Sequence, residues 1–153
     1  MKPGSLPHFE PRNPDYADRV RTSFGRQTAM ETMGISIEDV GPGWVEFGFE
    51  RRESLTQQHG LVHAGVIATA MDSACGYAAF SLMSDDAAVL TVEYKINLLN
   101  PADSDRYLVM GWVVKPGRTL TVCQAETTPV GKTRATAVMT ATIMTLLGSK
   151  LDS

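Results

Sequence analysis

The sequence has little cysteine or histidine, no surplus of positive charge and no long apolar run. A net charge of −3 provides no basic surface for nucleic acid. No uninterrupted apolar stretch reaches the length of a membrane span. Residues 1–13 are polar and proline-rich and lack the apolar centre of a signal peptide. We therefore expect no nucleic acid and no membrane as partner, and a location in the cytoplasm.

The few cysteines and histidines do not form a metal-binding pattern. Cys75 and Cys123 fall in predicted buried elements, where we expect small core residues in a reducing compartment rather than a disulfide. His8, His59 and His63 lack the helical spacing of zinc ligands, which argues against a metal hydrolase. No metal and no cofactor is expected.

What is present fits one domain. At 153 residues, with 43 % hydrophobic and 20 % charged residues, the chain resembles an ordinary globular protein with a single core. We predict a flexible tail at residues 1–13 and one domain over 14–148. Asn13 is the predicted cap of a surface helix at residues 14–33, with an interruption at Gly25.

Six stretches predict β-strands. In the second of them Val45, Phe47 and Phe49 share one face, and the strand at 88–99 alternates apolar with polar residues. Short loops between strands imply a mainly antiparallel sheet, covered on one face by one long helix. The fold class is α+β, and the uncovered sheet face and edges predict oligomerisation. The predicted strands are residues 35–40, 44–50, 88–99, 107–115, 119–128 and 133–147.

The first candidate catalytic residues lie in the long predicted helix between Leu61 and Met83. Only His63 and Asp72 can carry a charge near neutral pH there, and a helix that is apolar nearly all round is a buried one. Burying a carboxylate in such a helix costs free energy unless it has an ion-pair or hydrogen-bond partner, so an unpaired one points to a catalytic role. Asp72 is therefore the first candidate catalytic residue.

A second group of candidates lies where this helix begins. Gln57, His63 and the backbone N–H groups of Ala64 and Gly65 converge there, and the positive end of a helix dipole suits a carbonyl oxygen that becomes negative. Nine residues separate His63 from Asp72, which places them on opposite sides of the helix and about 13 Å apart along it. Either they are unrelated, or Asp72 meets the helix start of another subunit.

Ordinary structural roles remain open for each candidate. His63 could be a hydrogen-bonded structural histidine, and Asp72 a carboxylate held by hydrogen bonds. His59 is expected to be a loop residue. Spacing alone does not choose between Gln57 and Gln58.

The run Gln57-x-x-Gly60-x-x-His63-Ala64-Gly65 followed by Asp72 resembles the motif of hotdog-fold acyl-CoA thioesterases of the phenylacetic-acid-degradation type. The resemblance extends from about Met33 to Leu147. It includes the strand at residues 91–101 and the hairpin tip at residues 115–119. Ala64 replaces the usual glycine and Gln57 the commoner asparagine, which leaves the N–H and the amide in place.

This resemblance implies an antiparallel sheet wrapped around one helix, in dimers with a continuous sheet that usually pair into tetramers. It implies that Asp72 acts from one subunit, while Gln57, His63 and the Ala64 N–H come from the other. Acyl-CoA is the implied substrate, with Gly65 at the approach to the helix and the hairpin tip holding phosphate groups. The implied residues of the tip are Lys115, Gly117 and Arg118.

The implied reaction is hydrolysis of the thioester. The Ala64 N–H polarises the acyl carbonyl, and Asp72 acts as general base on water or as nucleophile. Gln57 holds the water or the thioester, and Thr91 assists the water near Asp72. His63 orients the loop.

Two rival functions stay open, and so does the acyl preference. One rival is a hotdog enoyl-CoA hydratase or dehydratase, although a nine-residue spacing between histidine and acid argues against it. The other is a non-catalytic acyl-CoA-binding protein. The floor of the acyl pocket is expected to include Val66, Met71 and Tyr77, together with residues of a partner chain.

Overall fold

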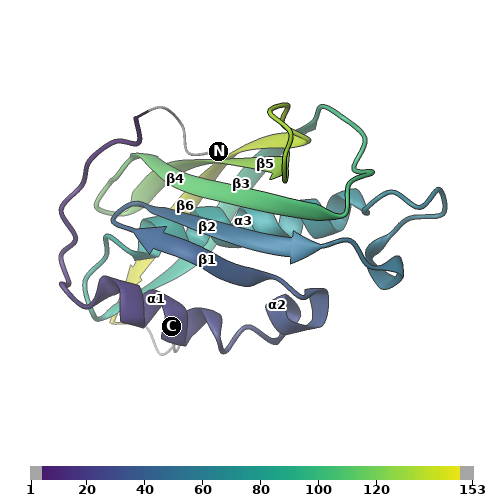
Figure 1. The fold of residues 1–153 in the computed structure, drawn as a ribbon. Helices are drawn as coiled ribbons and strands as arrows, with labels where there is room; N and C mark the ends of the chain where they lie inside the picture. The colour runs from purple at the N-terminus through teal and green to yellow at the C-terminus, as the bar shows by residue number, and fades with distance from the viewer. Residues whose placement is uncertain (1–4, 149–153) are drawn as a thin grey trace.

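The protein, described by a computed structural model over residues 5–148, folds as one antiparallel sheet around one long helix (Figure 1). The sheet has six strands in the order β1-β2-β4-β5-β6-β3, and every neighbouring pair is antiparallel. The helices are α1 (Tyr16–Phe24), α2 (Thr28–Met33) and α3 (Ala64–Phe80), with a 3-10 turn at Glu53–Leu55. The strands are β1 (Ser36–Gly41), β2 (Trp44–Glu50), β3 (Ala87–Leu98), β4 (Arg106–Lys115), β5 (Leu120–Pro129) and β6 (Ala137–Leu147).

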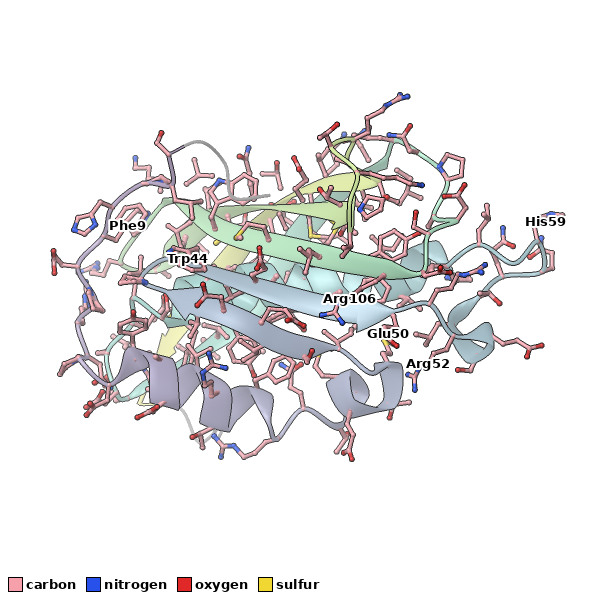
Figure 2. All side chains as sticks on the ribbon, viewed as in Figure 1. Phe9, Trp44, Glu50, Arg52, His59 and Arg106 are labelled. Carbon is pink, nitrogen blue, oxygen red and sulfur yellow. The ribbon has the colours of Figure 1, made fainter. Side chains whose placement is uncertain are left out.

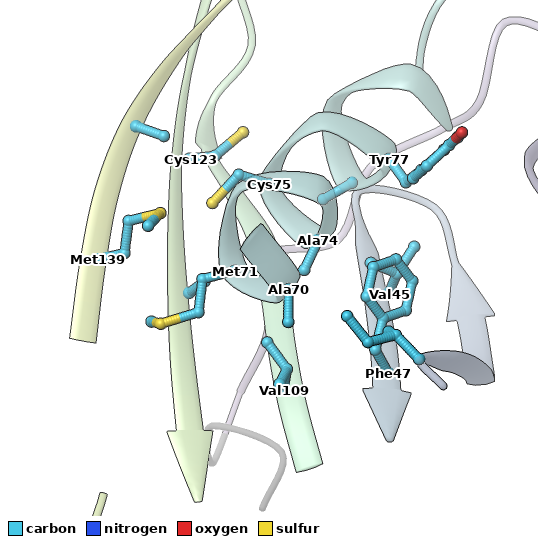
Figure 3. Close-up of a cluster of buried hydrophobic side chains, with 14 of the residues drawn as sticks. Val45, Phe47, Ala70, Met71, Ala74, Cys75, Tyr77, Val109, Cys123 and Met139 are labelled. Carbon is cyan, nitrogen blue, oxygen red and sulfur yellow. The ribbon is translucent and has the colours of Figure 1, made fainter. Parts of the chain in front are cut away.

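The predicted α+β class and the central helix are confirmed. Helix α3 packs against β2 to β6 and supplies the middle of the core (Figure 3). It approaches β4 closely, because a β-carbon at Gly111 would lie 2.5 Å from the carbonyl carbon of Ala74. Glycine at this strand position therefore lets the helix backbone lie directly on the sheet.

The hairpin and the two cysteines also match their predictions. Val45, Phe47 and Phe49 of β2 are at most 2 % exposed, which confirms that they face the core. Cys75 and Cys123 are free thiols inside the same core (Figure 3).

The N-terminal helical region differs in detail from its prediction. The interruption at Gly25 is confirmed, since it separates α1 from α2. Asn13 is not the helix cap: α1 starts at Tyr16 after Asp15, and Asn13 Oδ1 instead accepts a hydrogen bond from the Asp15 N–H at 2.8 Å. The side chain therefore forms a turn before the helix, as asparagine often does. Residues 5–13 have no helix or strand, and Phe9 packs against the core.

Two strand predictions need correction. Residues 133–136 belong to the loop before β6, where the Thr136 carbonyl accepts hydrogen bonds from the N–H groups of Leu99 and Asn100. The alternation in β3 predicts one buried face, but Leu90, Val92 and Tyr94 are each 46–54 % exposed. β3 is an edge strand, and residues 90–95 are all exposed in the single chain.

None of the helices within residues 5–148 is both long enough and apolar enough to cross a membrane.

Candidate active site

The start of α3 is held by a short loop with several backbone hydrogen bonds. The turn begins where the Gln57 N–H donates to the Leu61 carbonyl, and Gly60 has the positive φ of 79° that such a turn needs. The Val62 N–H then donates to the Ala102 carbonyl, and the His63 N–H to the Leu55 carbonyl. The helix start is therefore fixed against the segment that follows β3.

His63 is the cap of α3. Its Nδ1 accepts a hydrogen bond from the Gly65 N–H at 2.8 Å, so the ring proton lies on Nε2. A β-carbon at residue 65 would lie 3.0 Å from that nitrogen, which explains the glycine. The structural role left open for His63 is thus present, and the Gly65 N–H is already used.

The Ala64 N–H remains as the donor at this helix end. Within residues 5–148 it has no hydrogen-bond acceptor, and Ala64 is only partly buried. A helix N-terminus without an acceptor attracts a negatively polarised oxygen. This helix start is therefore suited to a carbonyl oxygen that accepts a hydrogen bond from the Ala64 N–H.

Gln57 faces the same region with its amide already oriented. Its Oε1 accepts a hydrogen bond from the His59 N–H, which leaves the NH₂ group of Gln57 as a donor. His59 itself lies at the outer end of the loop that precedes α3 and is exposed (Figure 2), in line with the expected loop role. Gln57, and not Gln58, lines the neighbouring cavity.

That cavity, which we call the helix-start cavity, has a volume of about 450 Å³. Polar side chains such as Gln57 and Asn100 and apolar side chains such as Ile67 and Leu98 both line it. The residues that line it are Gln57, Leu61, Val62, His63, Ala64, Ile67, Leu98, Leu99, Asn100, Pro101, Ala102 and Thr136.

Asp72 lies in a different place. Its Oδ1 accepts a hydrogen bond from Thr91 Oγ1 at 2.7 Å, which joins α3 to β3. The expectation of a helix buried all round is wrong in the single chain, because Asp72 and its neighbours Ser73, Thr69 and Ala68 are only partly buried. One side of α3 is thus only partly covered by residues 5–148.

Asp72 and Thr91 line a second cavity of about 710 Å³, which we call the aspartate cavity. It shares no residue with the helix-start cavity. His63 and Asp72 therefore line separate cavities, and one chain does not bring them together. The lining residues are Ser23, Arg26, Gln27, Asp72, Ser73, Gly76, Tyr77, Phe80, Ala88, Val89, Leu90 and Thr91.

Several residues of the aspartate cavity were missed by the sequence interpretation. Ser23, Arg26 and Gln27 lie where α1 passes into α2, a region predicted only as a surface helix. The available signal was the four-residue spacing of Ser23 and Gln27. It lies beside the apolar stripe that Tyr16, Val20 and Phe24 form at the same spacing. Of the expected pocket floor, Tyr77 lines this cavity, whereas Met71 is fully buried in the core (Figure 3).

The predicted phosphate-binding residues lie at the other end of α3. Gly117 and Arg118 line a cavity of about 210 Å³ together with Phe9 and with Leu82, just beyond the helix. Lys115 ends β4 and is exposed. One chain therefore does not bring this hairpin tip to Gln57. Among residues 5–148, no three histidine, cysteine, aspartate or glutamate side chains are grouped so as to hold a metal ion.

Comparison with known proteins agrees with this architecture. The sequence profile of the thioesterase superfamily matches residues 59–133. A candidate esterase of Halobacterium salinarum is 32 % identical over 115 residues, covering 72 % of this chain and 76 % of the relative. The match to a candidate esterase of Saccharolobus solfataricus is 34 % identical over 90 residues, and it spans 59 % of this chain and 59 % of that relative's length.

Solved structures extend the likeness over most of the chain. A thioesterase family protein from Silicibacter pomeroyi is 55 % identical with a TM-score of 0.84, over 87 % of this chain and 99 % of that one. The E. coli PaaI protein from the phenylacetic acid degradation operon has a TM-score of 0.81 at 16 % identity, over 88 % and 96 % of the two chains, which is a likeness of fold. The chain therefore belongs to the thioesterase superfamily, a family of thioester hydrolases, and it has the hotdog fold.

Proposed function

We propose that the protein hydrolyses acyl-CoA thioesters at two equivalent sites, each shared between two subunits. One observation carries this proposal: Asp72 and the Ala64 N–H lie in separate cavities that share no lining residue. Each cavity holds half of the groups that thioester hydrolysis needs. A second copy of the chain supplies the other half.

The edge strand β3 offers a way to bring the halves together. Within residues 5–148 no strand pairs with its outer edge, and it carries exposed apolar side chains, which a solitary edge strand normally avoids. Thr91 lies beside the aspartate cavity, and Leu98, seven residues later on β3, lies beside the helix-start cavity. Antiparallel pairing of two β3 strands about a centre near Tyr94 sets Thr91 of one subunit opposite the partner's Leu98.

In this dimer each residue has a distinct part in the reaction. The Ala64 N–H and the dipole of α3 stabilise the negative charge that develops on the thioester oxygen. Asp72 of the other subunit takes a proton from water, whose oxygen attacks the acyl carbon, and the CoA thiolate then leaves. The hydroxyl of Thr91 holds the Asp72 carboxylate, and the NH₂ of Gln57 binds the water or the thioester.

The remaining groups serve the substrate and the scaffold. His63 orients the helix start through its bond to Gly65, so it is a positioning residue. Lys115, Gly117 and Arg118 bind the phosphate groups of CoA, since lysine and arginine are the usual phosphate ligands. We further infer a single domain over residues 14–148, a tetramer built from two such dimers, and a cytoplasmic setting. The two free thiols support a reducing compartment.

A complementation experiment tests the shared site directly. Asp72→Asn and Gln57→Ala chains carry different affinity tags, are co-expressed and are purified through both tags. In the mixed dimer one site receives an intact Asp72 and an intact Gln57, so about half of the wild-type activity per dimer is expected. Release of CoA thiol is measured with a chromogenic thiol reagent.

The matched control places the same two substitutions in one chain. A dimer of wild type with the double variant has no intact shared site and is expected to be inactive. Sites confined to single chains give the inverse pattern, with an active control and an inactive complementation pair. That pattern would overturn the proposal. So would an active protein that light scattering shows to be a monomer.

A further inference from the structure

A polar corner closes the aspartate cavity beyond Asp72. It consists of Ser23, Gln27, Ser73 and Tyr77, contributed by α3 and by the region where α1 passes into α2. Gln27 Nε2 donates to the Tyr77 hydroxyl at 3.2 Å, and Gln27 Oε1 accepts from Ser73 Oγ at 3.3 Å. The Ser23 and Tyr77 hydroxyls are hydrogen-bonded at 3.1 Å. The Tyr77 ring belongs to the core, and its hydroxyl points away from the core cluster (Figure 3).

This polar corner has more donor hydrogens than its own hydrogen bonds use. The three hydroxyls and one amide carry five such hydrogens, and the three bonds above use three of them. Burial raises the pKa of Tyr77, so its hydroxyl stays protonated and remains a donor at neutral pH. The corner is therefore suited to a ligand that brings acceptor oxygens.

Arg26 adds a positive charge to the same wall. Its guanidinium is exposed, lines the cavity, and is near enough to act electrostatically on Tyr77. No ion pair within residues 5–148 includes Arg26. Among the described residues that line the cavity, Asp72 is the one carboxylate, and it is bonded to Thr91. The charge of Arg26 is thus available to an anion from outside the chain.

The separation of Arg26 and Tyr77 from Asp72 suits two ends of one acyl group. Tyr77 follows Asp72 by five residues, or about 7.5 Å along the helix axis. Gly76, Phe80 and Val89 also line this cavity and give it apolar surface that suits methylene groups. A negative group close to Asp72 would be repelled, whereas one at the polar corner would meet donors and a cation.

We propose that Arg26, Gln27 and Tyr77 bind the distal end of the acyl group and select acyl-CoAs whose acyl chain ends in a second carboxylate. This inference rests on the proposed function and names the substrate class of that same site. The second carboxylate accepts hydrogen bonds from the polar corner and pairs with Arg26. Its methylene chain crosses the apolar wall, and its thioester lies beside Asp72.

Matched pairs of substrates test the inference. The kcat/KM values of glutaryl-CoA and adipyl-CoA are compared with those of valeryl-CoA and hexanoyl-CoA, which have equal chain lengths and no second carboxylate. The wild type is expected to prefer the carboxylated member by about ten-fold or more, chiefly through a lower KM. Because the contact is ionic, the preference is expected to shrink as ionic strength rises.

Variants test whether Arg26 and Tyr77 cause the preference for carboxylated acyl groups. Arg26→Gln is expected to reduce the ratio within each pair to near one, and Tyr77→Phe to reduce it in part. Arg21→Gln removes the same charge from exposed α1 surface outside the cavity and is expected to leave the ratio unchanged. Circular dichroism and melting curves show whether each variant remains folded.

Two outcomes separate this inference from the proposed function. Hydrolysis that depends on Asp72 but shows no preference for carboxylated acyl groups, or a preference that survives Arg26→Gln, overturns the inference alone. Absence of hydrolysis of every acyl-CoA, or hydrolysis that survives Asp72→Asn, overturns the proposed function as well.

Discussion

Thr91 Oγ1 donates a hydrogen bond to Asp72 Oδ1 at 2.7 Å and so couples the edge strand to the central helix. Replacing Thr91 with valine keeps the shape and removes the donor, so the carboxylate loses one fixed partner. We expect kcat to fall by about ten-fold, the worth of one hydrogen bond to a charged group. Thr91→Ser restores the hydroxyl and should recover most of the activity. Equal activity of the valine and serine variants would show that the bond has no part in catalysis.

Replacing Asp72 with asparagine tests the proposed general base. The amide keeps the size of the side chain but cannot take a proton from water. We expect kcat to fall by at least about a hundred-fold on every acyl-CoA of a panel, the usual contribution of a general base. The melting temperature should stay close to that of the wild type, since Asp72 is only partly buried. A folded variant with most of its kcat would contradict the assignment.

His63 should matter for stability through its capping bond to the Gly65 N–H. His63→Ala removes the acceptor and is expected to lower the free energy of unfolding by about 1 kcal/mol, measured by urea denaturation. His63→Asn keeps a capping acceptor and should recover most of that loss. If asparagine also restores kcat, the imidazole acts through position alone. A selective loss of kcat in His63→Asn would instead assign His63 a role in proton transfer.

Replacing two glycines on facing elements with alanine should change the free energy of unfolding in opposite directions. At Gly111 a methyl group would meet the backbone of Ala74 at 2.5 Å, so Gly111→Ala is expected to destabilise the fold by roughly 1–3 kcal/mol. At Gly76, inside α3, no atom lies within 4 Å of an added β-carbon. Gly76→Ala is expected to stabilise the chain by about 0.5–1 kcal/mol, because alanine favours the helix. Urea denaturation of both variants gives the comparison.

The two buried thiols should be inert while the protein is folded. Burial raises the pKa of the Cys75 thiol and raises that of Cys123 to about 12. Neither should react with a chromogenic thiol reagent at neutral pH, and both should react in guanidinium, so they add no background to a CoA-release assay. Fast labelling of the folded protein would show that the core opens.

Because the pKa values of both thiols are raised in the folded protein, the free energy of unfolding is expected to fall as pH rises into the alkaline range. An unfolded thiol loses its proton near its ordinary pKa, whereas the folded thiol keeps it. The contribution of the protonated thiols is therefore complete below about pH 9 and is lost as pH rises towards the folded value of about 12 for Cys123. Cys123→Ala should weaken this alkaline decline in the free energy of unfolding.

Local sequence patterns predicted the elements well and their surroundings less well. The hairpin of β1 and β2 and the break at Gly25 followed from residue spacing. The partial exposure of Asp72 did not follow from residue spacing. Helical periodicity identifies an apolar stripe without showing how much of the helix the sheet covers. The alternation in β3 was likewise correct as a strand signal but did not show that the strand lies at the sheet edge with residues 90–95 exposed, since nothing local marks a strand as an edge.

The sequence by itself determined that the candidate groups of Gln57 and His63 stand at the start of one helix and that Asp72 lies nine residues after His63 within it, because position along a helix follows from residue spacing alone. Only the tertiary structure decided that Asp72 meets Thr91, that His63 uses its Nδ1 on Gly65, and that Ser23 and Gln27 reach Tyr77. These contacts join segments far apart in the chain or depend on side-chain rotation. They arise from packing, which residue spacing does not specify.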